Sequence, residues 1–197
     1  MWAVLTADAG RHAVLALAAL LCAAAIGAPL GVVAATSTPW RGPILGLAAF
    51  GRTLPSIALL TLLIPLLGVG APPAIVALAL LALPPIVINV DLGIRNTPAA
   101  ALDAATGLGM SAMQRFTRVR APHALPIAIA GIRTASVEVI GSATLATFIG
   151  AGGLGDDIVR GLQTGDTTLL VLASAIVAGM ALLVELSFDF AARAASA

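Results

Sequence analysis

Five stretches of the chain are almost entirely apolar, and each is long enough to cross a membrane as a helix. The apolar core of a bilayer is about 30 Å thick, so a crossing helix needs roughly 20 mostly apolar residues. The stretches that meet this requirement lie at about residues 13–35, 42–68, 74–93, 124–149 and 167–188. The pattern therefore predicts a single all-α membrane domain over residues 1–197, with about five transmembrane helices.

The second and third stretches carry charged residues and prolines. Arg52, Pro55 and Pro65 lie within 42–68, so we expect this stretch to be bent and to line a polar space in part. Adjacent prolines, Asn89 and Asp91 occupy the second half of 74–93. A polar, proline-rich helix end suits contact with protein or water better than contact with lipid.

The apolar pattern breaks between the third and fourth stretches. Residues 95–123 hold the densest charge in the chain, and Gly107 and Gly109 divide them into two expected short helices. Cytoplasmic loops retain an excess of arginine, and six arginines fall on the side of this segment, against Arg11 and Arg160 on the other. We therefore expect the N-terminus outside the cell, and both 95–123 and the C-terminus in the cytoplasm. The six are Arg41, Arg95, Arg115, Arg118, Arg120 and Arg193.

The composition agrees with a membrane location and excludes several activities. Hydrophobic residues make up 60% of the chain and charged residues 10%, and the mean hydropathy is +1.08. All ten cationic residues are arginine, so the chain has no Walker A loop, which requires a lysine. Any ATP and Mg²⁺ must then bind to partner subunits, and this chain is expected to hold no cofactor. The net charge of +1 gives no basic surface for nucleic acid.

Residues that could carry out catalysis or bind a metal are scarce. The single cysteine, Cys22, lies in an apolar stretch, and the two histidines, His12 and His123, are expected at opposite membrane faces. No grouping of nucleophile and base, and no set of metal ligands, can be identified. The sequence therefore predicts that the chain is not an enzyme and has no metal site.

One motif lies in the charged segment. It reads LDAATGLGM at 102–110 and QRFTRVRAP at 114–122. A helix with small residues such as Ala104 and Ala105 has a low-relief face that fits into a groove of another protein, and a glycine four residues later lets the chain reverse. The alternative is an ordinary interfacial loop between two spans.

This motif resembles the EAA loop of ABC importer permeases. Asp103 stands where that family usually has Glu, Gly109 holds the glycine position, and Val119 and Pro122 hold the ending. Ala121 departs from the leucine that usually precedes the proline. In that family the loop forms a coupling helix that docks on the ATPase subunit. The residues to which the resemblance gives this role are Asp103, Ala104, Ala105, Gly107, Gly109, Met110, Phe116 and Pro122.

Three flanking segments, 52–70, 83–98 and 130–155, look like permeases that import osmoprotectants such as glycine betaine, choline, carnitine or proline. Parts of the first and third are shared with methionine importers, so a permease for methionine or another small solute is the alternative. The resemblance covers about residues 40–190 and implies the transmembrane domain of a type I ABC importer. A membrane enzyme or a scaffold without transport is the alternative from another class.

The resemblance also implies partners and a mechanism. Two permease subunits, identical or related, would enclose the path in the cell membrane, in contact with lipid. An external substrate-binding protein would deliver the solute, and ABC ATPase subunits would drive alternating access. Aromatic residues are only 4% of the chain, too few for the aromatic cage that normally binds quaternary ammonium groups. We therefore expect the main selection of solute on the binding protein.

Polar residues within the predicted spans, together with a glycine-rich turn, are candidates for the translocation path or its gate. Arg133 and Glu138 are five residues apart, which is about 140° around a helix, so they do not share a face. Two roles for Glu138 stay open: an ion pair with Arg52 on another helix, or contact with a cationic head group in transit. The full candidate set is Arg52, Asn89, Asp91, Arg133, Glu138, Phe148, Gly152 and Gly153.

The glycine-rich turn reads GAGGLGDD at 150–157. Its glycines permit a close helix approach or a re-entrant bend at the outer mouth, or else they form a flexible loop. Phe148 beside it either helps to close an outer gate or simply packs. The charged residues Asp156, Asp157 and Arg160 either meet the binding protein or lie in a solvated loop.

Overall fold

The computed structural model describes residues 2–196, and all regular secondary structure in this part of the chain is helical. Six α-helices are long: α1 Trp2–Thr36, α2 Thr38–Gly51, α5 Ala71–Arg95, α8 Ala121–Ala143, α9 Leu154–Thr164 and α10 Thr167–Ser196. The short elements are α3 Ser56–Leu62, α4 Ile64–Leu67, α6 Ala99–Gly107, α7 Ala112–Arg115, the π-helix η1 Phe116–Arg120 and the 3₁₀-helix η2 Thr144–Ile149. The predicted all-α class is confirmed.

Four helical segments are long and apolar enough to cross a membrane, and the count becomes five if a broken pair forms one span. The broken pair is α2 with α3 and α4, which bends by 99°. The bend expected in 42–68 lies between Arg52 and Pro55, and Pro55 is the N-cap of α3. Helix α1 begins eleven residues before the expected 13, and α10 runs past the expected 188.

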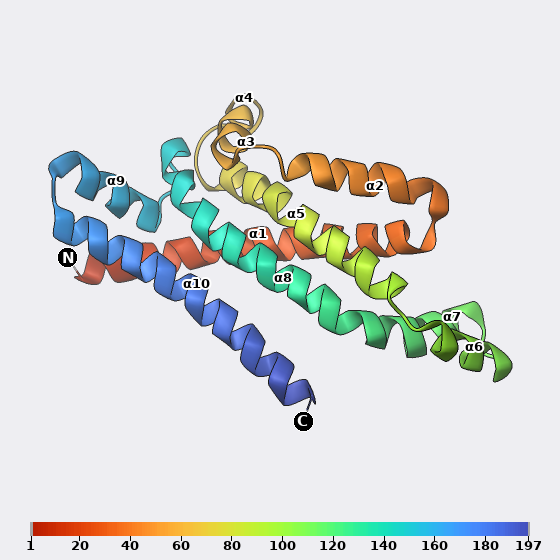
Figure 1. Cartoon of the computed structure of the whole chain (residues 1–197). Coiled ribbons are helices and arrows are strands. Elements are labelled where there is room, and N and C mark those ends of the chain that lie inside the picture. Colours follow the sequence, from red (N-terminus) through yellow and green to blue (C-terminus); the bar gives the residue numbers. More distant parts are fainter. Residues whose placement is uncertain (1, 197) are drawn as a thin grey trace.

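Helix α5 lies at the centre of the bundle, between α1 and α8 (Figure 1). Helix α10 packs along α8 and α9 on the outside of the bundle. The N-terminus and α9 lie at one end of the molecule, whereas α6 and α7 lie at the opposite end. The bundle therefore has two distinct poles, one formed by the glycine-rich turn and the other by the charged segment.

Glycines allow α5 to approach both neighbours closely. A Cβ atom at Gly31 of α1 would lie 2.6 Å from Cβ of Val90, and one at Gly131 of α8 would lie 2.7 Å from the carbonyl oxygen of Pro85. Gly93 of α5 faces the backbone of α8 in the same way, 2.7 Å from the carbonyl oxygen of Ala124. Small residues at helix contacts drive packing in lipid, where the hydrophobic effect does not hold helices together.

We predict that Gly131→Ala destabilises the bundle, because the added methyl group meets backbone that cannot rotate away. Overpacking of this kind costs about 1–3 kcal/mol. Gly141→Ala, on the same helix, is the matched control, since no heavy atom lies within 4 Å of its added Cβ. The thermal unfolding midpoint of the purified transporter should fall for Gly131→Ala and stay level or rise for Gly141→Ala. Equal midpoints for the two variants would contradict the packing described here.

Candidate functional site

The charged segment folds as a helical hairpin whose turn depends on Gly109. Gly109 has φ +71°, a left-handed conformation that glycine adopts at little cost. Its N–H donates to the carbonyl of Thr106 at 2.9 Å, and the N–H of Met110 donates to that of Ala105 at 3.1 Å. These two bonds form a Schellman motif, which ends α6 and satisfies its last carbonyls. The glycine of the sequence motif is thus required by backbone geometry.

The second half of the hairpin is held by polar side chains. Ser111 and Gln114 form a capping box at the start of α7, with bonds of 3.3 Å and 2.8 Å. Arg115 Nη1 donates to Thr106 Oγ1 at 2.9 Å and so joins α7 to α6. The chain then continues without a break from Ala112 to Ile149 as one helical segment of 38 residues. The hairpin is therefore connected directly to α8.

The hairpin presents an exposed surface of small and apolar side chains. Asp103, Ala104 and Gly107 are exposed, whereas Ala105 is the one buried residue of α6. Leu108 and Met113 are 76% and 70% exposed. Among the other predicted docking residues, Pro122 is exposed, and Met110 and Phe116 are half-buried. The motif did not single out Leu108 or Met113, although two apolar residues within a charged loop were a signal for them.

The predicted path residues near the bundle centre do not all face open space. Asp91 is 4% exposed and accepts hydrogen bonds of 3.2 and 3.1 Å from Arg41 on α2. Asn89 donates to the carbonyl of Pro85 at 2.7 Å, beside Gly131. The structure therefore places Asp91 and Asn89 at helix contacts, where they join α2, α5 and α8.

Arg133 lies between two carboxylates that the sequence pattern did not connect with it. Its guanidinium forms ion pairs with Glu185 and Asp189, both on α10. Asp189 was expected in a tail beyond the last span, but α10 continues past it, and residues 185 and 189 lie one turn apart on one face. The sequence pattern did not give the full length of α10, and therefore did not show that Asp189 lies on the same helix face as Glu185.

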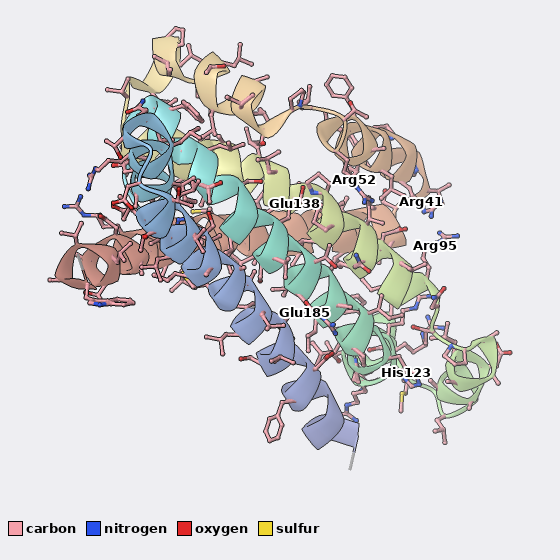
Figure 2. The ribbon with its side chains drawn as sticks, turned by 60° about the vertical axis from the view of Figure 1, so that its left-hand side comes forward. Arg41, Arg52, Arg95, His123, Glu138 and Glu185 are labelled. Atoms are coloured by element: carbon pink, nitrogen blue, oxygen red, sulfur yellow. The ribbon has the colours of Figure 1, made fainter. Side chains whose placement is uncertain are left out.

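Glu138 lies on the same groove as Arg133, and none of the ion pairs in the described part of the chain includes it. The ion pair with Arg52, one of the two roles considered for Glu138, is thus not formed in this conformation. Figure 2 shows Glu138 on α8, Glu185 on α10 and Arg52 at the end of α2. The helical projection separated Arg133 from Glu138, but the groove is wide enough for both.

The groove between α8 and α10 has a volume of about 710 Å³. Its walls are mainly apolar, with a few charged and polar groups. The residues that line it are Ala130, Arg133, Thr134, Val137, Glu138, Ala181, Leu182 and Glu185. The groove is open to the outside of the bundle.

The glycine-rich turn packs closely on other elements at the opposite pole. Gly152 and Gly153 have φ values of +80° and +91°, and a Cβ at Gly153 would lie 3.3 Å from Cα of His12. Gly155 faces the backbone of Thr144, and a Cβ at this position would lie only 2.2 Å from the carbonyl oxygen of Thr144. The turn is thus a close-packed element and not an open loop. Phe148 beside it is 58% exposed.

Two titratable side chains, one at the end of this turn and one in α1 beside it, are fully buried. His12 lies in α1 and makes a 2.9 Å hydrogen bond through Nε2 with the carbonyl of Ile140. Asp157 of α9 accepts a 3.4 Å bond from Arg160 at Oδ1. Burial raises the pKa of Asp157, the neighbouring Asp8 raises it further, and Arg160 opposes the shift. Asp156 accepts a hydrogen bond from Thr147.

Taken together, the helical bundle, the exposed hairpin at one pole and the groove between α8 and α10 are the features of a multi-pass membrane protein. A family model described as "Binding-protein-dependent transport system inner membrane component" matches residues 27–196. The chain belongs to this family of transport permeases. It is therefore a multi-pass inner-membrane protein and a transport subunit.

Curated relatives are 35–38% identical to this chain over the aligned residues. The glycine betaine/carnitine/choline permease OpuCB of Bacillus subtilis is 38% identical over 176 residues, which cover 89% of this chain and 81% of the relative. The choline permease OpuBB of the same organism is 38% identical over 183 residues, which cover 93% of this chain and 84% of the relative. The osmoprotectant permease OsmY of Salmonella typhimurium is 35% identical and covers 89% and 75%.

Solved structures show the same fold. The MetNI methionine ABC transporter, in an inward-facing conformation, matches with a TM-score of 0.87 at 24% identity, covering 98% of this chain and 97% of its own. A structure of an amino acid ABC transporter with histidines matches with a TM-score of 0.81 at 17% identity, covering 96% and 93%. The predicted fold, a type I ABC importer transmembrane domain, is confirmed.

The buried Asp157 predicts a pH-dependent stability at the outer turn. Its pKa is higher in the folded chain than in the unfolded chain, so the folded state binds the proton more tightly. Stability from this group is present below the unfolded-state pKa and is lost as the pH rises through the folded-state pKa. Asp157→Asn should therefore raise the thermal unfolding midpoint at pH 8, and the gain over the unmodified chain should shrink towards pH 4.5.

The control for this measurement is Asp103→Asn, which changes an exposed carboxylate in the hairpin. Its effect on the unfolding midpoint at pH 8 should be small, because the carboxylate that it replaces is exposed. A lower midpoint for Asp157→Asn at pH 8 would show that the charged form of Asp157 stabilises the turn, contrary to this prediction.

Proposed function

We propose that this chain is the permease subunit of an ABC importer that takes up osmoprotectants carrying a quaternary ammonium group, such as glycine betaine, choline or carnitine, or the related solute proline. The observation that carries this proposal is the 35–38% identity to osmoprotectant permeases across 89–93% of the chain. The likeness to the methionine transporter is in fold, at 24% identity. Methionine or another small solute is the alternative substrate.

The proposed mechanism assigns separate tasks to the partners. An extracytoplasmic binding protein captures the solute, and ATPase subunits bind ATP and Mg²⁺. The hairpin docks on an ATPase subunit through Asp103, Ala104, Gly107, Leu108 and Met113, all of which are exposed. Closure of the ATPase pair moves the hairpin, and the unbroken helical segment 112–149 carries that movement into the bundle.

A second permease subunit completes the path in this proposal. The groove between α8 and α10 is open on its outer side, and a single bundle does not enclose it. Two relatives from Bacillus subtilis have the same system name and differ as OpuCB and OpuCD, which supports a pair of related permeases as one form of this assembly. A pair of identical chains is the other form.

The proposed orientation places the hairpin in the cytoplasm and the N-terminus outside. Four arginines lie in or next to the hairpin, at one pole of the bundle. The N-terminal end of α1 and the glycine-rich turn lie at the opposite pole, where the binding protein would dock. The excess of arginine at cytoplasmic ends supports this orientation.

Solute uptake tests the proposed function. Cells that lack this chain should lose uptake of labelled glycine betaine or choline, and the chain should restore it. Labelled methionine serves as the control solute, and uptake is measured before and after a rise in external salt. Restored methionine uptake with unchanged betaine and choline uptake would favour the alternative substrate and contradict the osmoprotectant proposal.

We predict that Gly109→Pro abolishes coupling while the chain still reaches the membrane. Proline fixes φ near −65° and lacks the N–H that bonds to Thr106, so it cannot replace a glycine at φ +71°. Gly46→Ala, in α2 and outside the hairpin, is the control, since its φ is not positive and no atom lies within 4 Å of its added Cβ. The measurement is co-purification of the ATPase together with uptake. Retention of both by Gly109→Pro would contradict the proposed role of the hairpin.

A further inference from the structure

The groove between α8 and α10 contains more negative than positive side chains. Arg133 is held by Glu185 and Asp189, so its charge is already matched by two carboxylates. Glu138 is the other carboxylate of the lining, and none of the ion pairs in the described part of the chain includes it. The charged residues that line the groove are thus two carboxylates, Glu138 and Glu185, and one guanidinium group, Arg133.

Glu138 is the carboxylate of the groove lining that forms no ion pair. It is exposed along the groove, on a helix that is long and apolar enough to cross a membrane. A charged side chain at membrane depth is costly unless it faces water or a partner of opposite charge. No ion pair among the described residues includes Glu138, so its carboxylate faces the open groove and is accessible to a cation that enters it.

The walls of the groove restrict which cation fits there. Ala130, Val137, Ala181 and Leu182 give apolar walls around the carboxylate, in a volume of about 710 Å³. The described part of the chain contains no group of three His, Cys, Asp or Glu that could hold a metal ion. A hard divalent ion requires several oxygen ligands, and one carboxylate in an apolar groove does not provide them.

We propose that Glu138 is the anionic contact for the quaternary ammonium head group of the solute as it passes along this groove. The inference rests on the proposed function, because it names the residue that recognises that class of solute. A quaternary ammonium group has no N–H donor and carries methyl groups around its charge. One carboxylate attracts the charge, and the alanine, valine and leucine side chains contact the methyl groups.

The groove lacks the aromatic side chains that make quaternary ammonium sites tight, since its lining contains none. A site on a transport path must attract the solute and also release it, so weak binding is suitable here. Thr134 lies one helical turn before Glu138 on the same wall. Both residues belong to the helical segment that begins at the hairpin, so a movement of the hairpin changes the position of the carboxylate.

The test measures maximal uptake rates in the complete transporter with Glu138→Gln. Because the binding protein sets the half-saturating concentration in the proposed mechanism, this concentration should stay unchanged. The maximal rates for choline and glycine betaine should fall by about tenfold or more, because the neutral side chain no longer attracts the cationic head group. Glu138→Asp, which keeps the charge, should retain most of the rate.

A second pair of variants distinguishes charge recognition from a structural role. Thr134→Glu combined with Glu138→Gln returns a carboxylate to the same wall one turn away, and it should restore part of the maximal rate. Leu182→Arg in the unmodified chain places a positive charge on the facing wall and should lower uptake with Glu138 intact. This second variant also tests the inference if Glu138→Gln fails to assemble.

Each outcome separates this inference from the proposed function. Wild-type rates for choline and betaine in an assembled Glu138→Gln transporter would overturn the role of Glu138 and leave the proposed function standing. Loss of uptake in both Glu138→Gln and the double variant, together with normal uptake in Leu182→Arg, would show a structural role and overturn it as well. A wild-type transporter that takes up neither solute would overturn the proposed function itself.

Discussion

The close approach of α5 to α1 and α8 is the contact on which the rest of the structure depends. It is made at Gly31, Gly93 and Gly131, where a single methyl group would meet an adjacent side chain or backbone at 2.6–2.7 Å. Helices in lipid gain little from hydrophobic burial against one another, so contact between closely spaced backbones supplies much of the attraction. With α5 held in this way, α8 has a fixed partner on one face and leaves its other face for α10 and the groove.

Charged side chains in the bundle join segments that are distant in the sequence. The ion pair between Arg41 and Asp91 connects α2 to α5. Arg133 connects α8 to α10 through its ion pairs with Glu185 and Asp189. These pairs allow charged groups at membrane depth, because each charge has a partner. The same reasoning makes Glu138 distinctive, since it is exposed and no ion pair in the described part of the chain includes it.

The fold was predictable from the sequence because the requirement for about 20 apolar residues per span is simple and local. The bend at Arg52 was also predictable, since two prolines and a charge mark it. The partners of Arg133 were not, because an ion pair between residues 133 and 185 depends on how two helices pack. The same is true of His12 and Asp157, whose burial arises only when the glycine-rich turn lies on α1.

In the hairpin, in contrast, the sequence motif predicted the turn that the structure shows. Gly109 was expected to permit a reversal of the chain, and the structure gives the physical reason, a positive φ with two Schellman hydrogen bonds. The motif did not mark Leu108 or Met113, because exposed apolar side chains vary in position where a partner sets the fit. A docking surface is therefore identified better from the exposure of its side chains than from a sequence motif, because the motif marks the turn that supports the surface.

The arrangement of hairpin and groove on one helical segment has a mechanical consequence for the proposed transport cycle. Residues 112–149 form one helical segment, and it contains η1 at the hairpin end and η2 near the glycine-rich turn. The ion pairs of Arg133 hold α10 to the middle of this segment. If the segment tilts at the hairpin, Glu138 moves with it. The facing wall of the groove lies on α10, so it moves together with Glu138 only as far as α10 follows the tilt. Coupling between an ATPase and a solute contact on the same helix then requires no relay through other parts of the bundle.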